Sequence, residues 1–176
     1  KSYRTALESA SHEDLHKEWE GYLQETLHHQ QVVRGLCATL GLAPNQTTPT
    51  RAVVGHIGKA LVQAIELARR NAGPEAAQVV AAECVVLAET KDHANWELLG
   101  RVAEVATGDI GRALKAAHDD VEQDEDHHLF HTKGWMRELA IQGLGLPAVL
   151  PPPEEVKQVK TAIGASRAEQ ARSSML

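Results

Sequence analysis

The sequence predicts an all-α protein, an antiparallel four-helix bundle, and three observations support that prediction. The 176 residues are rich in Ala, Leu, Glu, Gln and Arg, which favour helices, and only 3% of them are aromatic. Apolar residues recur every three or four positions over four long segments. Gly and Pro residues break the chain between these segments, and four helices with short connections pack most simply up and down.

The first long helix is expected to begin near Ser11 and to stop at Gly41. Its start is similar to a capping box, with Asp14 in the place of the usual Glu. The connection that follows contains the breakers Pro44, Asn45 and Pro49. The inward face of this helix is expected to carry Leu15, Glu18, Tyr22, Glu25, His29, Val32, Leu36 and Leu40.

Pro residues predict the start of the next two helices. Thr48 is expected to cap the second helix, with Pro49 at its first position, and this helix runs to about Asn71. The pair Gly73-Pro74 ends one element and starts the third helix, which is expected to run to about Thr107.

The fourth helix is expected from about Asp109 to Gln142, after the break at Gly108. Prolines at 147 and 151–153 prevent its continuation, and residues 154–170 have the pattern of a short amphipathic helix. We therefore expect a four-helix bundle over residues 1–146 and a Pro-rich C-terminal tail over residues 147–176. The sequence leaves open whether this tail is disordered, lies along the bundle or lies along a neighbouring subunit.

Composition excludes several classes of function. The net charge is −6 and the chain has no basic run, so no nucleic-acid partner is expected. No apolar run reaches the roughly 20 residues that span a bilayer, and no signal peptide opens the chain, so we expect a cytoplasmic protein without a membrane partner. Cys37 and Cys84 are isolated and are expected to be packing residues. There is no nucleophile constellation or Gly-rich phosphate loop, which argues against nucleotide-dependent group transfer.

Two segments with the pattern Glu-Thr-x-x-His, residues 25–29 and 89–93, repeat at an offset of 64 positions. Each presents a carboxylate and an imidazole on one helix face, and the offset predicts two helical hairpins related by a pseudo-two-fold axis. The last helix carries a third such cluster in residues 118–128, which includes the spacing Glu125-x-x-His128. These polar residues fall among apolar ones, and a bound metal would remove the cost of burying unpaired carboxylates.

The sequence thus predicts that one or two metal ions lie within the bundle. Iron is the expected metal, although manganese and zinc also suit these residue types, and iron there could react with oxygen or peroxide. The second helix offers no inward carboxylate, only His56, which favours an incomplete or mononuclear site. His12, His127 and His131 are expected to be exposed. The expected ligands are Glu25, His29, Glu89, His93, Glu125 and His128, with Glu83, Asp92, Glu122, His118 and His28 as substitutes.

Short motifs resemble the YciF-like branch of the ferritin-like superfamily over roughly residues 16–130. Glu25-Thr26 followed by Leu40-Gly41 is similar to its "Leu-Glu-Glu-Thr … Leu-Gly" stretch, and residues 89–96 are similar to its "Glu-His-Tyr-Glu-x-Ala-x-Tyr". The acidic run 119–126 resembles the acidic stretch of its last helix. The resemblance implies a ferritin-like bundle, often a homodimer, associated with bacterial stress responses. We also expect a homodimer because Trp19 and Trp135 are expected to lie partly outside a narrow core.

Two further interpretations remain open from the sequence. A haemerythrin-like oxygen carrier would use His118-x-x-x-Glu122, together with the His-x-x-x-His spacing of His127 and His131, although these all lie on one helix. A non-catalytic helical stress or interaction protein would instead satisfy its acids and histidines by mutual hydrogen bonds.

Overall fold

A computed structural model describes all 176 residues and contains helices but no strand, which confirms the all-α class. None of these helices is both long enough and apolar enough to cross a membrane. The helices are α1 (Ser2–Leu7), α2 (Glu13–Thr39), α3 (Pro49–Asn71), α4 (Pro74–Val105), α5 (Gly108–Gly143), α6 (Pro153–Val156) and α7 (Ala162–Gln170), followed by the 3-10 turn η1 (Arg172–Ser174).

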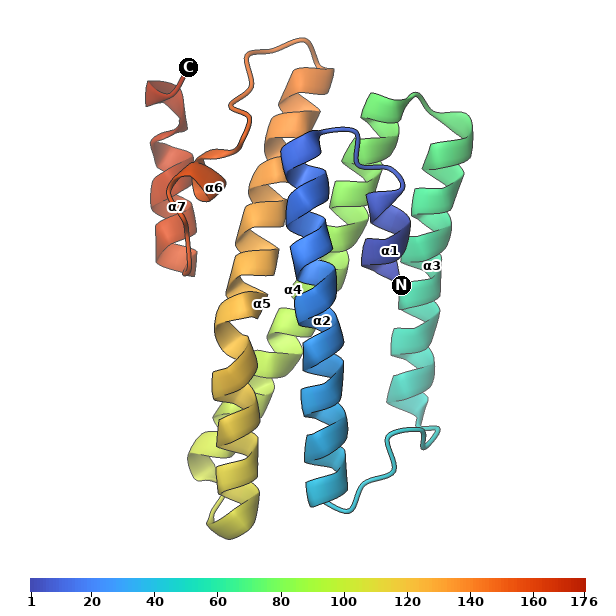
Figure 1. Cartoon of the computed structure of the whole chain (residues 1–176), viewed down its shortest axis with the longest axis vertical. Coiled ribbons are helices and arrows are strands. Elements are labelled where there is room, and N and C mark those ends of the chain that lie inside the picture. The colour runs from blue at the N-terminus through green and yellow to red at the C-terminus, as the bar shows by residue number, and fades with distance from the viewer.

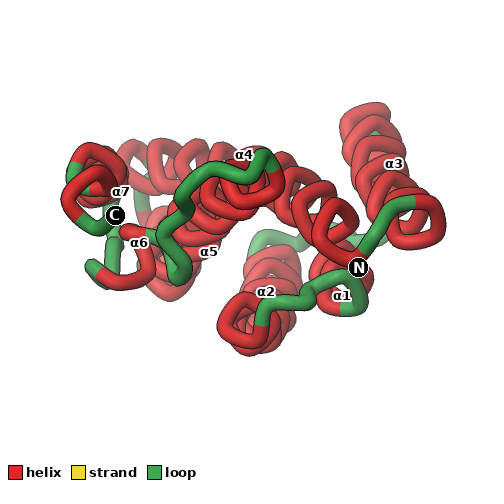
Figure 2. Tube along the Cα trace, turned by 90° about the horizontal axis from the view of Figure 1, so that it is seen from above, coloured by secondary structure: helices red, strands yellow, loops and turns green.

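The α4–α5 hairpin forms the centre of the molecule, with α3 packed against α4 and α2 packed against α5 (Figure 1). The short helix α1, which the sequence did not predict, contacts α2, α3 and α4 and lies between α2 and α3 (Figures 1 and 2). It buries Tyr3 and Ala6 there. The four long helices therefore form an opened arrangement, with α1 filling the space where α2 and α3 would otherwise meet.

The predicted breaks between the long helices are confirmed at residues 40–48, 72–73 and 106–107. Thr48 caps α3 as expected, because its hydroxyl oxygen accepts a hydrogen bond from the Arg51 backbone N–H at 3.1 Å. The capping box predicted at Ser11 is wrong. The side-chain oxygen of Gln78, on α4, instead accepts bonds from the backbone N–H groups of Ser11 and His12, each at 2.7 Å.

The largest apolar cluster joins all five helices from α1 to α5, with Ile65 as the buried residue of α3. Trp19 and Trp135 both lie in it with no exposed surface, so the expectation that they protrude from a narrow core is wrong. Burial of the Trp135 indole is compensated, since its N–H donates to a carboxylate oxygen of Glu18 at 2.6 Å.

Residues after Pro147 lie along α5, where α6 and α7 form two separate short helices rather than the single one predicted (Figure 1). Arg137 on α5 donates two hydrogen bonds to Glu154 on α6, at 2.8 and 2.9 Å. Glu138, fully buried on α5, accepts one from Arg172 at 2.7 Å and one from the Val149 backbone N–H at 2.8 Å. These bonds hold the C-terminal segment against the outer side of α5.

Candidate metal centre

Three helices supply a buried cluster of acids and imidazoles at mid-length. Glu25 and His29 are four residues apart on α2, and Glu125 and His128 are three apart on α5, so each pair shares a helix face. Glu89 on α4 completes the cluster. His29, Glu89, Glu125 and His128 are all buried, while Glu25 is partly exposed. We refer to these five residues as the central cluster.

His29 lies between two carboxylates of α5. Its Nδ1 is 2.8 Å from Oε1 of Glu125, and its Nε2 is 3.1 Å from Oδ2 of Asp124. The Glu125 side chain is 2% exposed and that of Asp124 is 37% exposed. One nitrogen of His29 therefore faces the interior of the bundle and the other faces its surface.

His128 repeats this arrangement with carboxylates from the other two helices. Its Nε2 is 2.7 Å from Oε2 of Glu25, a side chain that is 40% exposed. Its Nδ1 is 3.7 Å from Oε2 of Glu89, which is 8% exposed. In both imidazoles Nδ1 faces a buried acid and Nε2 faces an acid near solvent. Glu25 and Glu89 thus lie at opposite nitrogens of one ring.

The interior of the cluster contains polar atoms that make no hydrogen bond. These are Nδ1 of His128 and Oε2 of Glu125, both inaccessible to solvent. The rings of His29 and His128 are 5.6 Å apart between centroids. One ligand atom from each of His29, Glu125 and His128 lies within 4.8 Å of the others, so the three could contact one metal ion. Two imidazoles and a carboxylate are donors that suit zinc, iron or manganese.

Opposite charges hold these groups together when no metal is bound. Burial alone would lower the pKa of His128, but the carboxylates of Glu25 and Glu89 outweigh it and raise that pKa to about 9. Burial also acts to lower the pKa of His29. The hydrogen bonds to Glu125 and Asp124 favour its charged form more strongly, so this pKa is raised overall. The hydrogen bond from His128 keeps the pKa of Glu25 below its usual value.

A cavity of about 390 Å³ lies between α1, α2, α3 and α4 and reaches the central cluster. Tyr3, Glu89 and Asp92 are among the residues in its wall. Burial and the negative charge of Glu89 raise the pKa of the Tyr3 hydroxyl well above its usual value, so this group stays protonated. The cavity gives a small ion or molecule a route to Glu89.

His93, also predicted as a ligand, lies outside the central cluster. Its Nε2 is 2.6 Å from Oδ1 of Asp126, and its Nδ1 is 3.9 Å from Glu97. Among the substitute ligands, His28 is exposed and pairs with Asp120 at 3.0 Å, and His118 lies 3.5 Å from Glu122. The structure brings five of the six predicted ligands together, whereas His93 pairs with Asp126 instead. Glu83 is exposed on α4 and also lies apart from the cluster.

A second polar cluster was not predicted from the sequence. It contains Glu18 of α2, His127 and His131 of α5, and Glu155 of α6, with one ligand atom from each within 4.8 Å of the others. The expectation that His131 is exposed is wrong, because this residue has no accessible surface. The spacing of His127 and His131 and the inward position of Glu18 could be recognised from the sequence. The contact of Glu155 with His131 could not.

Comparison with protein-family models, with curated proteins and with solved structures finds no match to this chain. The function must therefore be inferred from the two clusters themselves.

Proposed function

We propose that this protein is a metal-binding helical bundle whose central cluster holds one transition-metal ion. The observation that supports it most directly is the pair of buried atoms without hydrogen bonds, Nδ1 of His128 and Oε2 of Glu125. A bound cation would contact both, and it would offset the cost of burying two carboxylates in the same place.

The proposed ligands are Nδ1 of His29, Nδ1 of His128 and the carboxylates of Glu125 and Glu89. Asp124 and Glu25 then take a supporting role, because each accepts a hydrogen bond from the Nε2–H of a ligand imidazole and fixes its tautomer. This division explains why each histidine has one carboxylate near solvent and one inside. A single ion rather than a pair suits the absence of a carboxylate from α3 in this cluster.

Iron is the metal that we propose, in keeping with the resemblance to the ferritin-like superfamily. The activity that we propose to assay is the oxidation of iron by peroxide or oxygen, as part of a stress response. Bound iron would supply redox chemistry at an open coordination position. The chain's own residues hold it on three helices and provide the cavity beside Glu89 through which a small oxidant could approach. The same resemblance supports a homodimer, which sedimentation at micromolar concentration would test.

The test is metal content. The untagged protein is stripped with a chelator, supplied in turn with iron, manganese and zinc, and analysed by mass spectrometry. We expect Glu125→Gln and Glu89→Gln to bind one equivalent less than the wild type, and His93→Gln, the matched control outside the cluster, to bind as much. Equal metal content in the wild type and Glu125→Gln would contradict the proposal.

A non-catalytic helical protein is the second candidate. It is favoured by the short contacts of His29 and His128 to acids, which satisfy most of their nitrogens without a metal. In that case the wild type retains no stoichiometric metal in the central cluster, and the variants above differ from it in stability alone.

A further inference from the structure

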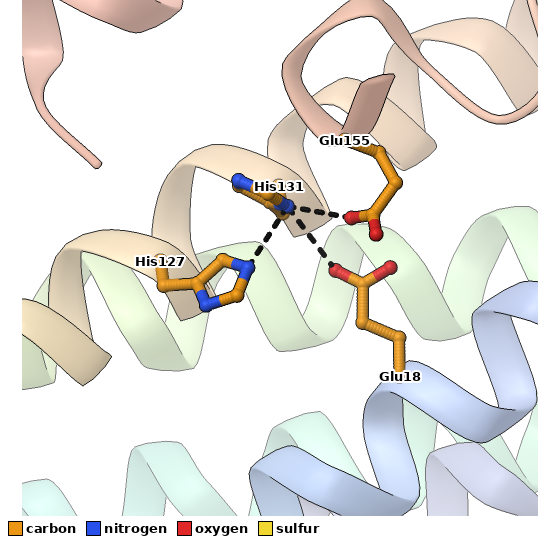
Figure 3. A group of neighbouring side chains, drawn as sticks. All are labelled: Glu18, His127, His131 and Glu155. Carbon is orange, nitrogen blue, oxygen red and sulfur yellow. Dashed lines mark hydrogen bonds and ion pairs between the residues drawn. The ribbon is translucent and has the colours of Figure 1, made fainter. Parts of the chain in front are cut away.

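The second cluster, Glu18, His127, His131 and Glu155, has the composition and geometry of a separate cation site (Figure 3). We propose that it binds a small divalent transition metal such as Zn²⁺, and that this ion fastens the C-terminal segment to α5. The site involves none of the residues of the central cluster. It would therefore stand even if the central cluster proved to hold no metal.

Three polar atoms converge on one nitrogen of His131. Its Nδ1 is 2.6 Å from Oε2 of Glu155, 3.0 Å from Nε2 of His127 and 3.7 Å from Oε1 of Glu18 (Figure 3). In a tetrahedral site with bonds of about 2.0–2.1 Å, ligand atoms lie roughly 3.3 Å apart. The observed separations fall on either side of that value, so a small shift of the side chains accommodates the ion.

The other nitrogen of His131 fixes which tautomer is present. Its Nε2 is 2.8 Å from the backbone carbonyl oxygen of Val159, and a carbonyl can only accept, so Nε2 carries the hydrogen. Nδ1 is then the nitrogen that faces Glu18, His127 and Glu155, and a bound metal ion would take the place of the hydrogen that it shares with Glu155 at 2.6 Å. A backbone carbonyl that orients an imidazole in this way is a common partner of metal-bound histidine.

Glu18 is also held in place by groups outside the cluster. The Trp135 indole N–H donates to its Oε2 at 2.6 Å, and the Tyr22 hydroxyl donates to its Oε1. These bonds leave one lone pair of Oε1 facing Nδ1 of His131. Two of the four proposed ligands are thus positioned by hydrogen bonds before any metal arrives.

Glu155 is the ligand that makes the site depend on the C-terminal segment. It lies on α6, which has only four residues, next to Glu154 with its two bonds to Arg137. When α6 is docked, Glu155 reaches His131, and when it departs the site loses one carboxylate and the Val159 carbonyl that orients His131. An ion bound here therefore stabilises the docked segment through mass action.

The binding experiment compares zinc stoichiometry in the full-length, untagged protein after removal of metal. We expect Glu155→Gln to lose one zinc ion relative to the wild type, while Glu169→Gln, a change at an exposed position on α7, loses none. Glu125→Gln removes a different ion, so the double variant Glu125→Gln/Glu155→Gln loses both. If Glu155→Gln binds as much zinc as the wild type, the second site is refuted, whatever happens in Glu125→Gln.

A second measurement does not depend on the stability of a variant. Amide hydrogen exchange of residues 153–170 in the wild type should slow on addition of zinc, roughly 100-fold at a free concentration 100 times the dissociation constant. The Glu155→Gln protein, checked for helicity by circular dichroism, should show no such slowing. Zinc that leaves the exchange of this segment unchanged in the wild type would overturn the fastening role.

Discussion

Glu25 on α2 and His128 on α5, 103 residues apart in sequence, are joined by a hydrogen bond of 2.7 Å from Nε2 of the imidazole to the carboxylate. This bond and the contact of Nδ1 with Glu89 raise the pKa of His128 to about 9, against the effect of its burial. His128 thus links α5 to α2 through Glu25 and to α4 through Glu89.

Stability of the metal-free protein should depend on this pKa. A folded-state pKa raised from 6.5 to about 9 means that the native state binds the proton more tightly than the unfolded chain. Protonated His128 therefore adds roughly 3 kcal/mol to the free energy of unfolding. This contribution is complete below pH 6.5 and is lost as the pH rises through about 9. We expect urea midpoints to fall over this range more steeply in the wild type than in His128→Gln. Parallel slopes in the two proteins would contradict this assignment.

Removal of a supporting carboxylate should weaken metal binding without abolishing it. Asp124→Asn loses the acceptor that faces Nε2 of His29, and such changes typically cost about 10- to 100-fold in affinity. Competition with a colorimetric chelator measures the dissociation constant. Asp126→Asn is the matched control, since Asp126 contacts His93 instead and its replacement should leave the affinity unchanged. An equal loss in both variants would show that general charge, not position, sets the affinity.

Replacement of Gln78, which caps the start of α2, should lower the free energy of unfolding more than replacement of Ser11. Gln78→Leu removes the acceptor of two backbone N–H bonds at 2.7 Å, which should lower the free energy of unfolding by roughly 2 kcal/mol. Ser11→Ala keeps both backbone bonds and should cost less than about 0.5 kcal/mol. Urea denaturation with unchanged m-values decides between them. The reverse order would restore Ser11 as the cap.

A methyl group at Gly134 should disturb the docked C-terminal segment. A Cβ atom there would lie 2.5 Å from Oε2 of Glu154 and 3.1 Å from Cβ of Pro152. Glu154 cannot turn aside without breaking its bonds to Arg137. We expect Gly134→Ala to lose about 1–3 kcal/mol and to expose residues 152–170 to hydrogen exchange.

The control for this change is Gly21→Ala on α2, where a Cβ would meet nothing within 4 Å. It should stabilise the protein by up to about 1 kcal/mol, because Ala favours helix over Gly. Equal exchange of the C-terminal segment in the two variants would argue against a close fit at Gly134.

The sequence predicted the long helices and most of the central cluster, because helical periodicity and Gly or Pro breakers are local signals. Glu25 and Glu125 could be identified because each interrupts an apolar face. The helix α1 could not be predicted, since six residues do not form a stable helix without the neighbours that bury Tyr3. His131 was misplaced for a related reason. Its burial depends on α6 and Val159, which are brought to it by ion pairs between residues distant in sequence.

Tyr22 lies between the two clusters, with its ring centroid 4.3 Å from that of His128 and 5.4 Å from that of His127. Its hydroxyl donates to Glu18, and these two histidines are consecutive residues that belong to different clusters. Two cations bound at the proposed sites would lie on either side of this ring, and any effect of one on the affinity for the other would be reciprocal. By whatever factor zinc beside Glu18 changes the affinity of the central cluster, occupancy of the central cluster changes the affinity for that zinc by the same factor. Docking of the C-terminal segment, which supplies Glu155, would thereby depend on whether the central cluster holds a metal ion.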